Sequence, residues 1–128
     1  MAAGGKRSTK REQILGTFLS NAVIFSPPDA PIALRAWVRD DRVHVAVTDR
    51  GAGLAEEEKP RTFERYYRPE RLREARREGL GLSLAVAAEL AALLGAEIAV
   101  DSAGVDRGST FTLRLRVAEA FGAADDEE

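Results

Sequence analysis

Cysteine is absent from the 128 residues of the sequence, so disulfides and thiolate metal sites are excluded. No apolar run approaches the roughly 20 residues that cross a bilayer. The basic residues near the N-terminus are not followed by the apolar segment of a secretory signal. Neither sign of charge is in large excess, because the net charge is only −2. We therefore expect a cytoplasmic domain that contacts neither nucleic acid nor membrane.

What the sequence does contain is the composition of one ordinary globular domain. Hydrophobic residues make up 45% and charged residues 31%, and the length supports a single core. The small, polar residues 1–9 predict a disordered leader, residues 10–117 the folded domain, and residues 118–128 an acidic, solvated tail. No internal repeat or linker divides the chain.

The spacing of apolar residues predicts two helices and four strands. Helical spacing predicts a first helix from about Lys10 to Phe25, ended by Ser26-Pro27-Pro28. An alanine- and leucine-rich segment closed by Gly95 predicts the second helix. Alternating residues predict strands, the first two joined by a tight hairpin, over residues 31–39, 42–49, 96–102 and 110–117. Short turns between neighbouring strands favour an α+β fold, a two-layer α/β sandwich with a mainly antiparallel sheet and both helices on one face.

An asparagine interrupts the apolar face of the first helix. Asn21 lies among residues at core-facing spacing, and an unpaired buried amide costs roughly 1–3 kcal/mol. It could bond to neighbouring backbone, which is the favoured interpretation in isolation, or present its carbonyl oxygen to a hard cation such as Mg²⁺. Thr17, Asn21 and Ile24 share a stripe beside the core-facing one, which would face the glycine-rich turns if those turns gather at one end of the sheet.

Two glycine-rich stretches border the predicted elements. In "DRGAG", Asp49 ends a strand, and Gly51 and Gly53 allow the backbone to approach a ligand closely. Such an aspartate could accept a hydrogen bond from the exocyclic amine of a base, although an ordinary turn is the favoured interpretation of this stretch alone. In "GLGLSLA", Gly79 and Gly81 precede a predicted helix whose free N–H groups could bind phosphate. A simple hinge is the alternative there.

A charged segment, residues 54–78, separates these two stretches. Its low aliphatic content predicts a mobile or surface loop. Within it, "FERYYR" combines aromatic residues that could pin the loop to the domain with Arg65 and Arg68, which could meet phosphate oxygens. A solvated charged surface is the equally weighted alternative. The single histidine, His44, alternates with valines on a strand and is interpreted as a surface residue.

The order and spacing of these stretches resemble those of a known family. "NAVIFSP", "DRGAG", "FERYYR", "GLGLSLA" and "GSTFTL" follow the order of the N, G1, F, G2 and G3 boxes of the GHKL ATP-binding fold. That superfamily includes gyrase, the large heat-shock chaperones, MutL and the sensor histidine kinases. The F box and the helix after "GLG" look most like the catalytic domain of bacterial two-component sensor kinases. The resemblance covers residues 10–117 and implies a Bergerat-type ATP-binding domain with residues 54–78 as its ATP lid.

The resemblance implies a role for each matching residue. Asn21 would coordinate the Mg²⁺ that bridges the ATP phosphates. Asp49 would accept a hydrogen bond from the adenine amine, supported through water by Thr110, and Gly51 and Gly53 would shape the base pocket. The other ATP-binding residues would be Phe25, stacked on the adenine, and a set near the phosphates: Arg65, Tyr66, Arg68, Gly79, Leu80, Gly81 and Leu82.

Three positions depart from the family pattern, and the two strands that usually precede the first helix are not evident. Thr17 stands where an earlier asparagine is common, Ile24 where a lysine often contacts phosphate, and Arg77 where the first glycine of the G2 box is usual. These departures motivate an alternative, a degenerate module of the same fold that acts in protein docking with weak or no catalysis. A serine kinase that resembles anti-sigma factors is a third alternative.

The resemblance also implies partners. Sensor kinases phosphorylate a histidine on a separate dimerisation helix bundle, and the sequence contains nothing like that bundle. We therefore expect an ATP-dependent protein histidine kinase domain that uses ATP and Mg²⁺. Its partner would be a histidine-bearing dimerisation or phosphotransfer domain, in the full-length protein or in a separate chain, with a response regulator further downstream. As a fragment, it would form the cytoplasmic part of a membrane-bound sensor kinase.

Overall fold

The structure, a computed structural model, describes residues 9–65, 67, 69–70 and 80–118. Two helices, one short 3₁₀ helix and four strands make up these residues. In chain order they are α1 (Lys10–Phe25), β1 (Ala33–Arg39), β2 (Arg42–Asp49), η2 (Lys59–Arg61), α2 (Leu80–Leu94), β3 (Glu97–Asp101) and β4 (Ser109–Arg116). The predicted order of helices and strands is confirmed.

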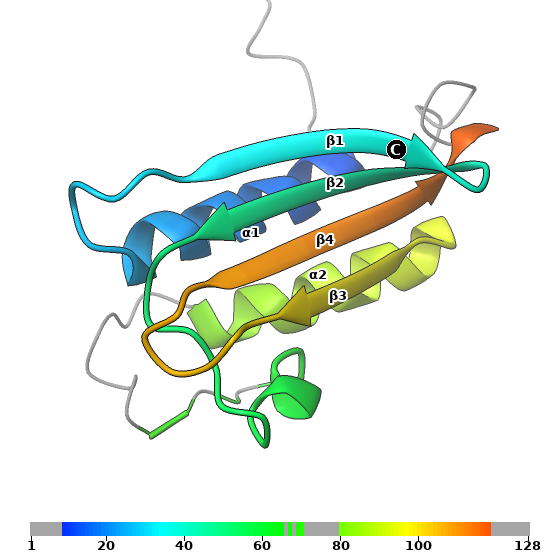
Figure 1. The fold of residues 1–128 in the computed structure, drawn as a ribbon. Coiled ribbons are helices and arrows are strands. Elements are labelled where there is room, and N and C mark those ends of the chain that lie inside the picture. Colours follow the sequence, from blue (N-terminus) through cyan, green and yellow to red (C-terminus); the bar gives the residue numbers. More distant parts are fainter. Residues whose placement is uncertain (1–8, 66, 68, 71–79, 119–128) are drawn as a thin grey trace, which may run out of the picture.

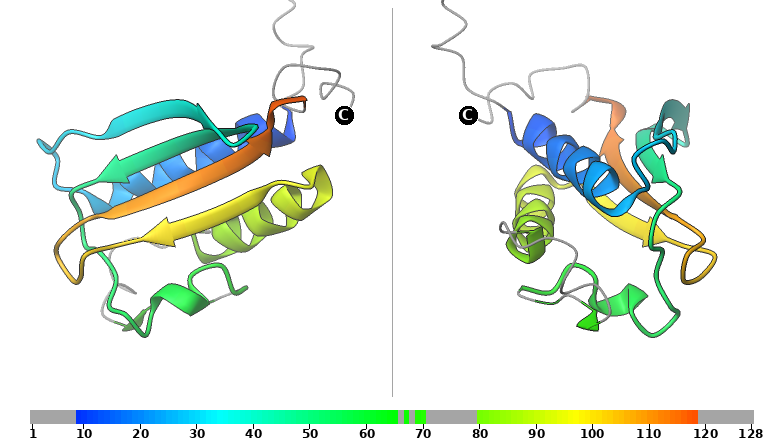
Figure 2. Two further views of the ribbon diagram at one scale, coloured as in Figure 1. Left: turned by 45° about the vertical axis from the view of Figure 1, so that its right-hand side comes forward. Right: turned by 90° about the vertical axis from the view of Figure 1, so that its left-hand side faces the viewer.

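The strands form one sheet in the order β1-β2-β4-β3, and every neighbouring pair is antiparallel. Helix α1 packs against β2 and β4, while α2 packs against α1 and β3. Both helices therefore lie on the same face of the sheet, and within the described residues the other face carries no helix (Figures 1 and 2). The predicted two-layer α/β sandwich is confirmed.

Local sequence explains where α1 and the first hairpin begin and end. A capping box starts α1, because the Glu12 N–H donates to Thr9 Oγ1 at 3.1 Å and the Thr9 N–H donates to Glu12 Oε1 at 2.9 Å. Ser26 has extended backbone and caps the end of the helix. Asp40 and Asp41 form the predicted tight hairpin with φ angles of 53° and 64°, which aspartate tolerates better than most residues.

The core lies between the helices and the inner face of β2 and β4. Ile14 and Phe18 of α1, with Val47 and Leu113, are its largest fully buried side chains. The rings of Phe18 and Phe111 lie 5.2 Å apart between centroids. Small residues of α2, among them two alanines that are almost fully buried, let the two helices approach each other closely.

The charged segment after β2 differs in part from the expected surface loop. Leu54 and Thr62 are buried, and Phe63 packs its ring edge-on against Phe111 with centroids 6.0 Å apart. Few aliphatic residues are needed to pack this segment against the core, because one aromatic ring contributes a large apolar surface. The suggestion that an aromatic residue pins this segment to the domain is therefore confirmed for Phe63, and Leu54 and Thr62 are buried as well, while the charged residues between them lie at the surface as predicted.

The start of the second helix also differs from the expectation. The described part of α2 begins at Leu80, so Gly81 lies within the helix and not before it. Gly95, with a φ of 71°, closes α2 as predicted. Neither helix in the described residues combines the length and the apolar character that crossing a membrane requires.

Candidate functional site

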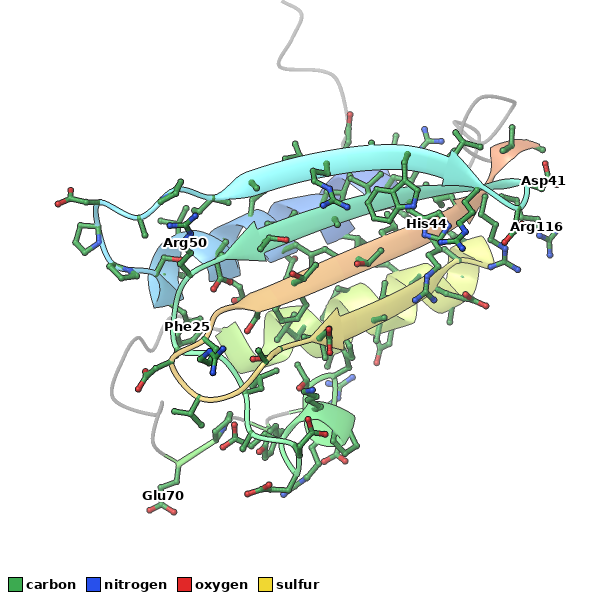
Figure 3. The ribbon with its side chains drawn as sticks, viewed as in Figure 1. Phe25, Asp41, His44, Arg50, Glu70 and Arg116 are labelled. Carbon is green, nitrogen blue, oxygen red and sulfur yellow. The ribbon has the colours of Figure 1, made fainter. Side chains whose placement is uncertain are left out.

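Four chain segments meet at one end of the sheet: the end of α1, the end of β2, the end of β3 and the start of β4. Phe25 and Arg50 both lie at this end, whereas Asp41 and Arg116 lie at the opposite end (Figure 3). The antiparallel order explains the meeting, because β2 and β3 run toward this end and β4 starts from it. Gly51, far from α1 in sequence, is thereby brought against the last turn of that helix, and Gly53 against the loop between β3 and β4.

Asp49 is the buried carboxylate of this end, with only 7% of its surface exposed. Its Oδ1 accepts a hydrogen bond of 2.8 Å from the Gly51 N–H. Burial raises the pKa of Asp49 above its usual value of 3.8, although backbone hydrogen bonds from Gly51 and Ser109 act in the opposite direction. The site thus holds a carboxyl group that can accept a further hydrogen bond from an N–H donor.

Gly51 allows the end of α1 to touch the turn after β2. A side-chain Cβ at this position would overlap the carbonyl oxygen of Phe25, which is backbone and cannot swing aside. Gly108 makes a similar contact, because a Cβ there would overlap the carbonyl oxygen of Asp49. Both positions therefore need glycine for close backbone packing.

Ser102 joins the turn after β2 to the loop between β3 and β4, and no sequence pattern indicated this role. Its buried hydroxyl accepts hydrogen bonds from the Leu54 N–H at 3.0 Å and the Gly104 N–H at 3.2 Å, and donates to the Gly108 carbonyl at 2.6 Å. The Asp106 N–H also donates to the carbonyl of Ala52 at 2.7 Å. A serine at the end of a predicted strand is too common a feature to have indicated this role.

Thr110 lies on the wrong face of the sheet to support Asp49. Adjacent strand residues point to opposite faces, and Thr110 pairs with Thr48, to which its hydroxyl is hydrogen-bonded at 2.9 Å. Ser109 is the residue paired with Asp49, and it is buried on the same face. The serine, not the threonine, is therefore the hydroxyl residue beside the carboxylate.

Asn21 is buried in α1, one helical turn before Phe25, and 4% of its surface is exposed. Its Oδ1 has no hydrogen-bond partner in the described part of the chain. A buried amide oxygen without a partner is costly unless something else binds it. An amide oxygen is also a hard ligand of the kind that Mg²⁺ prefers, so Asn21 fits the metal that the sequence suggested.

Of the two lid arginines predicted to meet phosphate, Arg65 lies in the described residues, and its side chain forms an ion pair. Arg65 Nη2 lies 2.9 Å from Glu89 Oε2, on α2. At 1.5 Å per residue, Glu89 is about 13 Å along the helix from Leu80, so Arg65 does not lie beside the first turn of α2, where the phosphates were expected. Tyr66, Arg68 and Gly79 lie outside the described residues.

The first turn of α2 holds the other predicted phosphate contacts. Gly81 and Leu82 follow Leu80 in the described part of this helix. Backbone N–H groups at the start of a helix lack partners within it and attract anions.

Comparison with known proteins agrees with the family resemblance. Residues 7–119 match the sequence profile of the histidine kinase-, DNA gyrase B-, and HSP90-like ATPases. The sensor-like histidine kinase SenX3 of Mycobacterium tuberculosis (strain ATCC 25618 / H37Rv) is 39% identical over 101 residues, which make up 79% of this chain and 24% of SenX3. The histidine protein kinase SaeS of Staphylococcus aureus (strain USA300) is 37% identical over 109 residues, or 84% of this chain and 31% of SaeS. The chain thus spans less than a third of these relatives.

Solved structures show the same likeness. The mycobacterial sensor histidine kinase MprB superposes with a TM-score of 0.74 and 26% identity, over 88% of this chain and 75% of the MprB chain. Full-length ShkA, solved in complex with AMPPNP, superposes with a TM-score of 0.70 and 30% identity, over 83% of this chain and 21% of ShkA.

Gly51→Ala is expected to destabilise the protein by roughly 1–3 kcal/mol, because the new methyl group forces the turn away from the Phe25 carbonyl. Gly16→Ala is the matched control, since nothing lies within 4 Å of a Cβ there. Because Gly16 lies within a helix, its replacement by alanine should stabilise the protein by about 1 kcal/mol. Urea unfolding of both variants measures the difference, and equal effects would contradict the close contact.

Asp49→Asn is expected to become more stable relative to the native protein as the pH rises. Because the folded protein raises the pKa of Asp49, the stability that this carboxyl contributes is greatest below its unfolded pKa and is lost as the pH rises through the folded pKa. Urea unfolding of both proteins at about pH 4, 5.5 and 7 measures the gap between them. A free energy of unfolding of the variant that stays constant or falls relative to that of the native protein as the pH rises would contradict the raised pKa.

Proposed function

The chain belongs to the histidine kinase-, DNA gyrase B-, and HSP90-like ATPase family and is a catalytic domain of the sensor histidine kinase type, and we propose that it transfers the γ-phosphate of ATP to a histidine on another domain. That histidine would lie on a dimerisation or phosphotransfer domain, in the same protein or in a separate chain. One observation carries the proposal for the site: the buried Asp49 carboxylate lies beside a glycine turn that packs on the end of α1.

Asp49 is proposed to recognise adenine. Its carboxylate keeps hydrogen-bonding capacity beyond the Gly51 N–H, and the exocyclic amine of adenine is a suitable donor. Gly51 and Gly53 pack their turn against the end of α1 and the loop between β3 and β4, and they would thereby shape the base pocket. Phe25, which is half-buried at the end of α1, would stack on the base. Ser109, beside Asp49, replaces Thr110 as the proposed supporting hydroxyl.

The phosphates are proposed to bind between α1 and the first turn of α2. The backbone N–H groups of Gly81 and Leu82 would contact phosphate oxygens. Asn21 Oδ1 would hold Mg²⁺, which when bound supplies positive charge that neutralises the phosphate oxygens. Arg65 and Arg68 remain proposed lid contacts, and Arg65 would have to leave Glu89 to reach a phosphate.

The phosphate acceptor is proposed to lie outside this chain. Its one histidine, His44, stacks on Trp37 on the sheet face away from both helices (Figure 3). It therefore cannot receive a phosphate from a nucleotide bound beside α1. Neutral imidazole is itself the nucleophile, so positioning and electrostatics are the catalytic contributions required of this domain.

A degenerate docking module is the second candidate function. Thr17 stands where an earlier asparagine is common in the family, and its hydroxyl donates to the Gln13 carbonyl of its own helix at 3.0 Å. Ile24 has no group that could bind phosphate. These two residues would weaken nucleotide turnover while the adenine end of the site keeps its shape.

Calorimetric titration with ADP, with and without Mg²⁺, is expected to show binding that Mg²⁺ strengthens. Asp49→Asn should weaken ADP binding about tenfold or more. The single amide oxygen would have to accept from both the Gly51 N–H and the adenine amine, which the two carboxylate oxygens can share. Asn21→Leu should leave the free energy of unfolding unchanged or increase it, because the unpartnered amide oxygen is removed, and should abolish the Mg²⁺ effect.

Three outcomes of this titration would contradict parts of the proposal. The absence of ADP binding to the native chain would overturn nucleotide binding altogether and favour the docking module. Binding that does not depend on Mg²⁺ would remove the role proposed for Asn21. A large loss of stability in Asn21→Leu would show that the amide serves the fold.

Incubation of the chain with labelled ATP and a histidine-bearing helix bundle from a sensor kinase is expected to give an acid-labile label on the bundle. Replacing the bundle histidine with glutamine is the control and should abolish the label. An acid-stable label on serine would favour the serine-kinase alternative. No label, despite ADP binding, would leave a nucleotide-binding docking module as the better account.

A further inference from the structure

Three arginines lie side by side across the sheet, on the face away from the two helices. Arg39 pairs with Arg42 across β1 and β2, and Arg42 pairs with Arg116 across β2 and β4. Paired residues of neighbouring strands project from the same face, so these side chains form one row, which we call the arginine row. Leu115, next to Arg116, is buried in the core, so the row projects from the opposite face.

Access to the arginine row does not depend on what borders the edge of the sheet. β2 and β4 are the inner strands of the order β1-β2-β4-β3. A further strand beside β1 would widen the sheet, but it would not cover the side chains of Arg42 and Arg116. Arg116 is exposed, and 37% of the Arg42 side chain is exposed. A binding segment can therefore reach the row from the face of the sheet.

The carboxylates near the arginine row do not balance its charge. Glu97 Oε1 lies 3.2 Å from Arg42 Nη1 and 3.1 Å from Arg114 Nη1, so one carboxylate serves two arginines. The hydrogen bond from Arg114 and the charge of Arg42 lower the pKa of Glu97. Arg39 Nε lies 4.0 Å from Asp40 Oδ2, and both side chains are largely exposed. Within the described residues, the row and Arg114 thus have ion pairs with two carboxylates for four guanidinium groups, and like charges directly opposite each other destabilise a strand pair.

An acidic segment of the same chain follows the arginine row. β4 ends at Arg116, and the Val117 N–H donates to the Asp41 carbonyl at 3.1 Å, beside the hairpin. Residues 119–128, which we call the acidic segment, contain five carboxylate side chains and no lysine or arginine. Asp125 is nine residues beyond Arg116, a length of chain that can span about 30 Å, whereas the row crosses three strands, or about 10 Å. The acidic segment is therefore long enough to reach back to the row.

We propose that the acidic segment binds the arginine row of its own chain. Its carboxylates would accept hydrogen bonds from the guanidinium groups and offset the repulsion between them. Because the segment is tethered to β4, its effective concentration at the row would be about millimolar, which favours it over an acidic segment of a separate protein. The proposal does not rest on the proposed kinase function, because Arg116 lies at the opposite end of the sheet from Phe25 (Figure 3).

Nucleic acid fits this face less well. Proteins that bind single strands combine basic side chains with aromatic rings on which bases stack. The Trp37 ring is stacked on His44, with centroids 5.0 Å apart, and the Arg35 guanidinium lies 4.9 Å from the Trp37 centroid. Two side chains already contact this ring, so it offers little surface to a base. The net charge of the chain is −2, so the rest of the molecule would also repel a long polyanion.

The chain provides a reporter for the proposed contact, because Trp37 is its single tryptophan and cysteine is absent. Trp37 is two residues before Arg39 on the same face of β1, so it lies beside the row. A bimane dye attached to Ala124→Cys is quenched when it touches a tryptophan. We expect at least about twofold quenching at about 20 mM salt and its loss at about 1 M salt, where the Debye length falls to about 3 Å. Trp37→Phe should abolish the quenching and thereby identify its source.

Replacing one arginine of the row tests the binding site. In the labelled chain, Arg116→Gln should reduce the quenching at least about twofold, because it removes one charged donor. Arg116 forms no ion pair within the described residues, so its replacement breaks none of those that hold the sheet. Arg50→Gln, the same change at the opposite end of the sheet, is the matched control and should leave the quenching unchanged (Figure 3). Replacing the acidic residues 125–128 by their amides should abolish it, and circular dichroism shows whether each variant is folded.

The absence of quenching in the labelled chain would overturn the proposal, and so would equal effects of Arg116→Gln and Arg50→Gln. Quenching that falls on dilution from about 10 µM to about 0.1 µM would assign the contact to a second copy, because a contact within one chain does not depend on concentration. If quenching is absent and Trp37 emission responds to added tetraglutamate or oligothymidine, the row binds another protein or nucleic acid instead. Titration with ADP measures nucleotide binding separately, so a failure of this proposal can be distinguished from a failure of the kinase proposal.

Discussion

The backbone contact between Gly51 and Phe25 determines how the first helix meets the sheet. It holds the end of α1 against the turn after β2. The residues one or two turns earlier on the helix therefore have fixed positions relative to the sheet. Asn21 is consequently buried close to this end of the sheet. A side chain at position 51 would separate the two segments, and the residues proposed to bind base and metal would lose their common position.

The polar groups buried at this end differ in how well they are satisfied. The Ser102 hydroxyl bonds to both loops and stabilises their conformation. The Asn21 oxygen has no partner in the described residues, and burial raises the pKa of Asp49. A fold tolerates incompletely bonded polar groups where a ligand completes them, and this contrast separates the residues proposed to bind nucleotide from those that support the loops.

Regular periodicity made the helices and strands predictable. The hairpin at Asp40-Asp41 and the closing Gly95 follow from local backbone chemistry, and the structure agrees with both. The face on which Thr110 points could not be predicted from the sequence, because it depends on which residue of β4 pairs with Asp49. The burial of Leu54 and Thr62 could not be predicted from composition, because composition averages over a segment and conceals single well-placed side chains.

The sequence by itself determined the order of the elements, the antiparallel sheet with helices on one face, and the family. These depend on side-chain periodicity and on short motifs, which are local properties of the chain. Only the tertiary structure decided that Ser109 accompanies Asp49, that Ser102 joins two loops, that Arg65 pairs with Glu89, and that three arginines form one row across the sheet. Each of these depends on the packing of segments far apart in sequence, which no local pattern specifies.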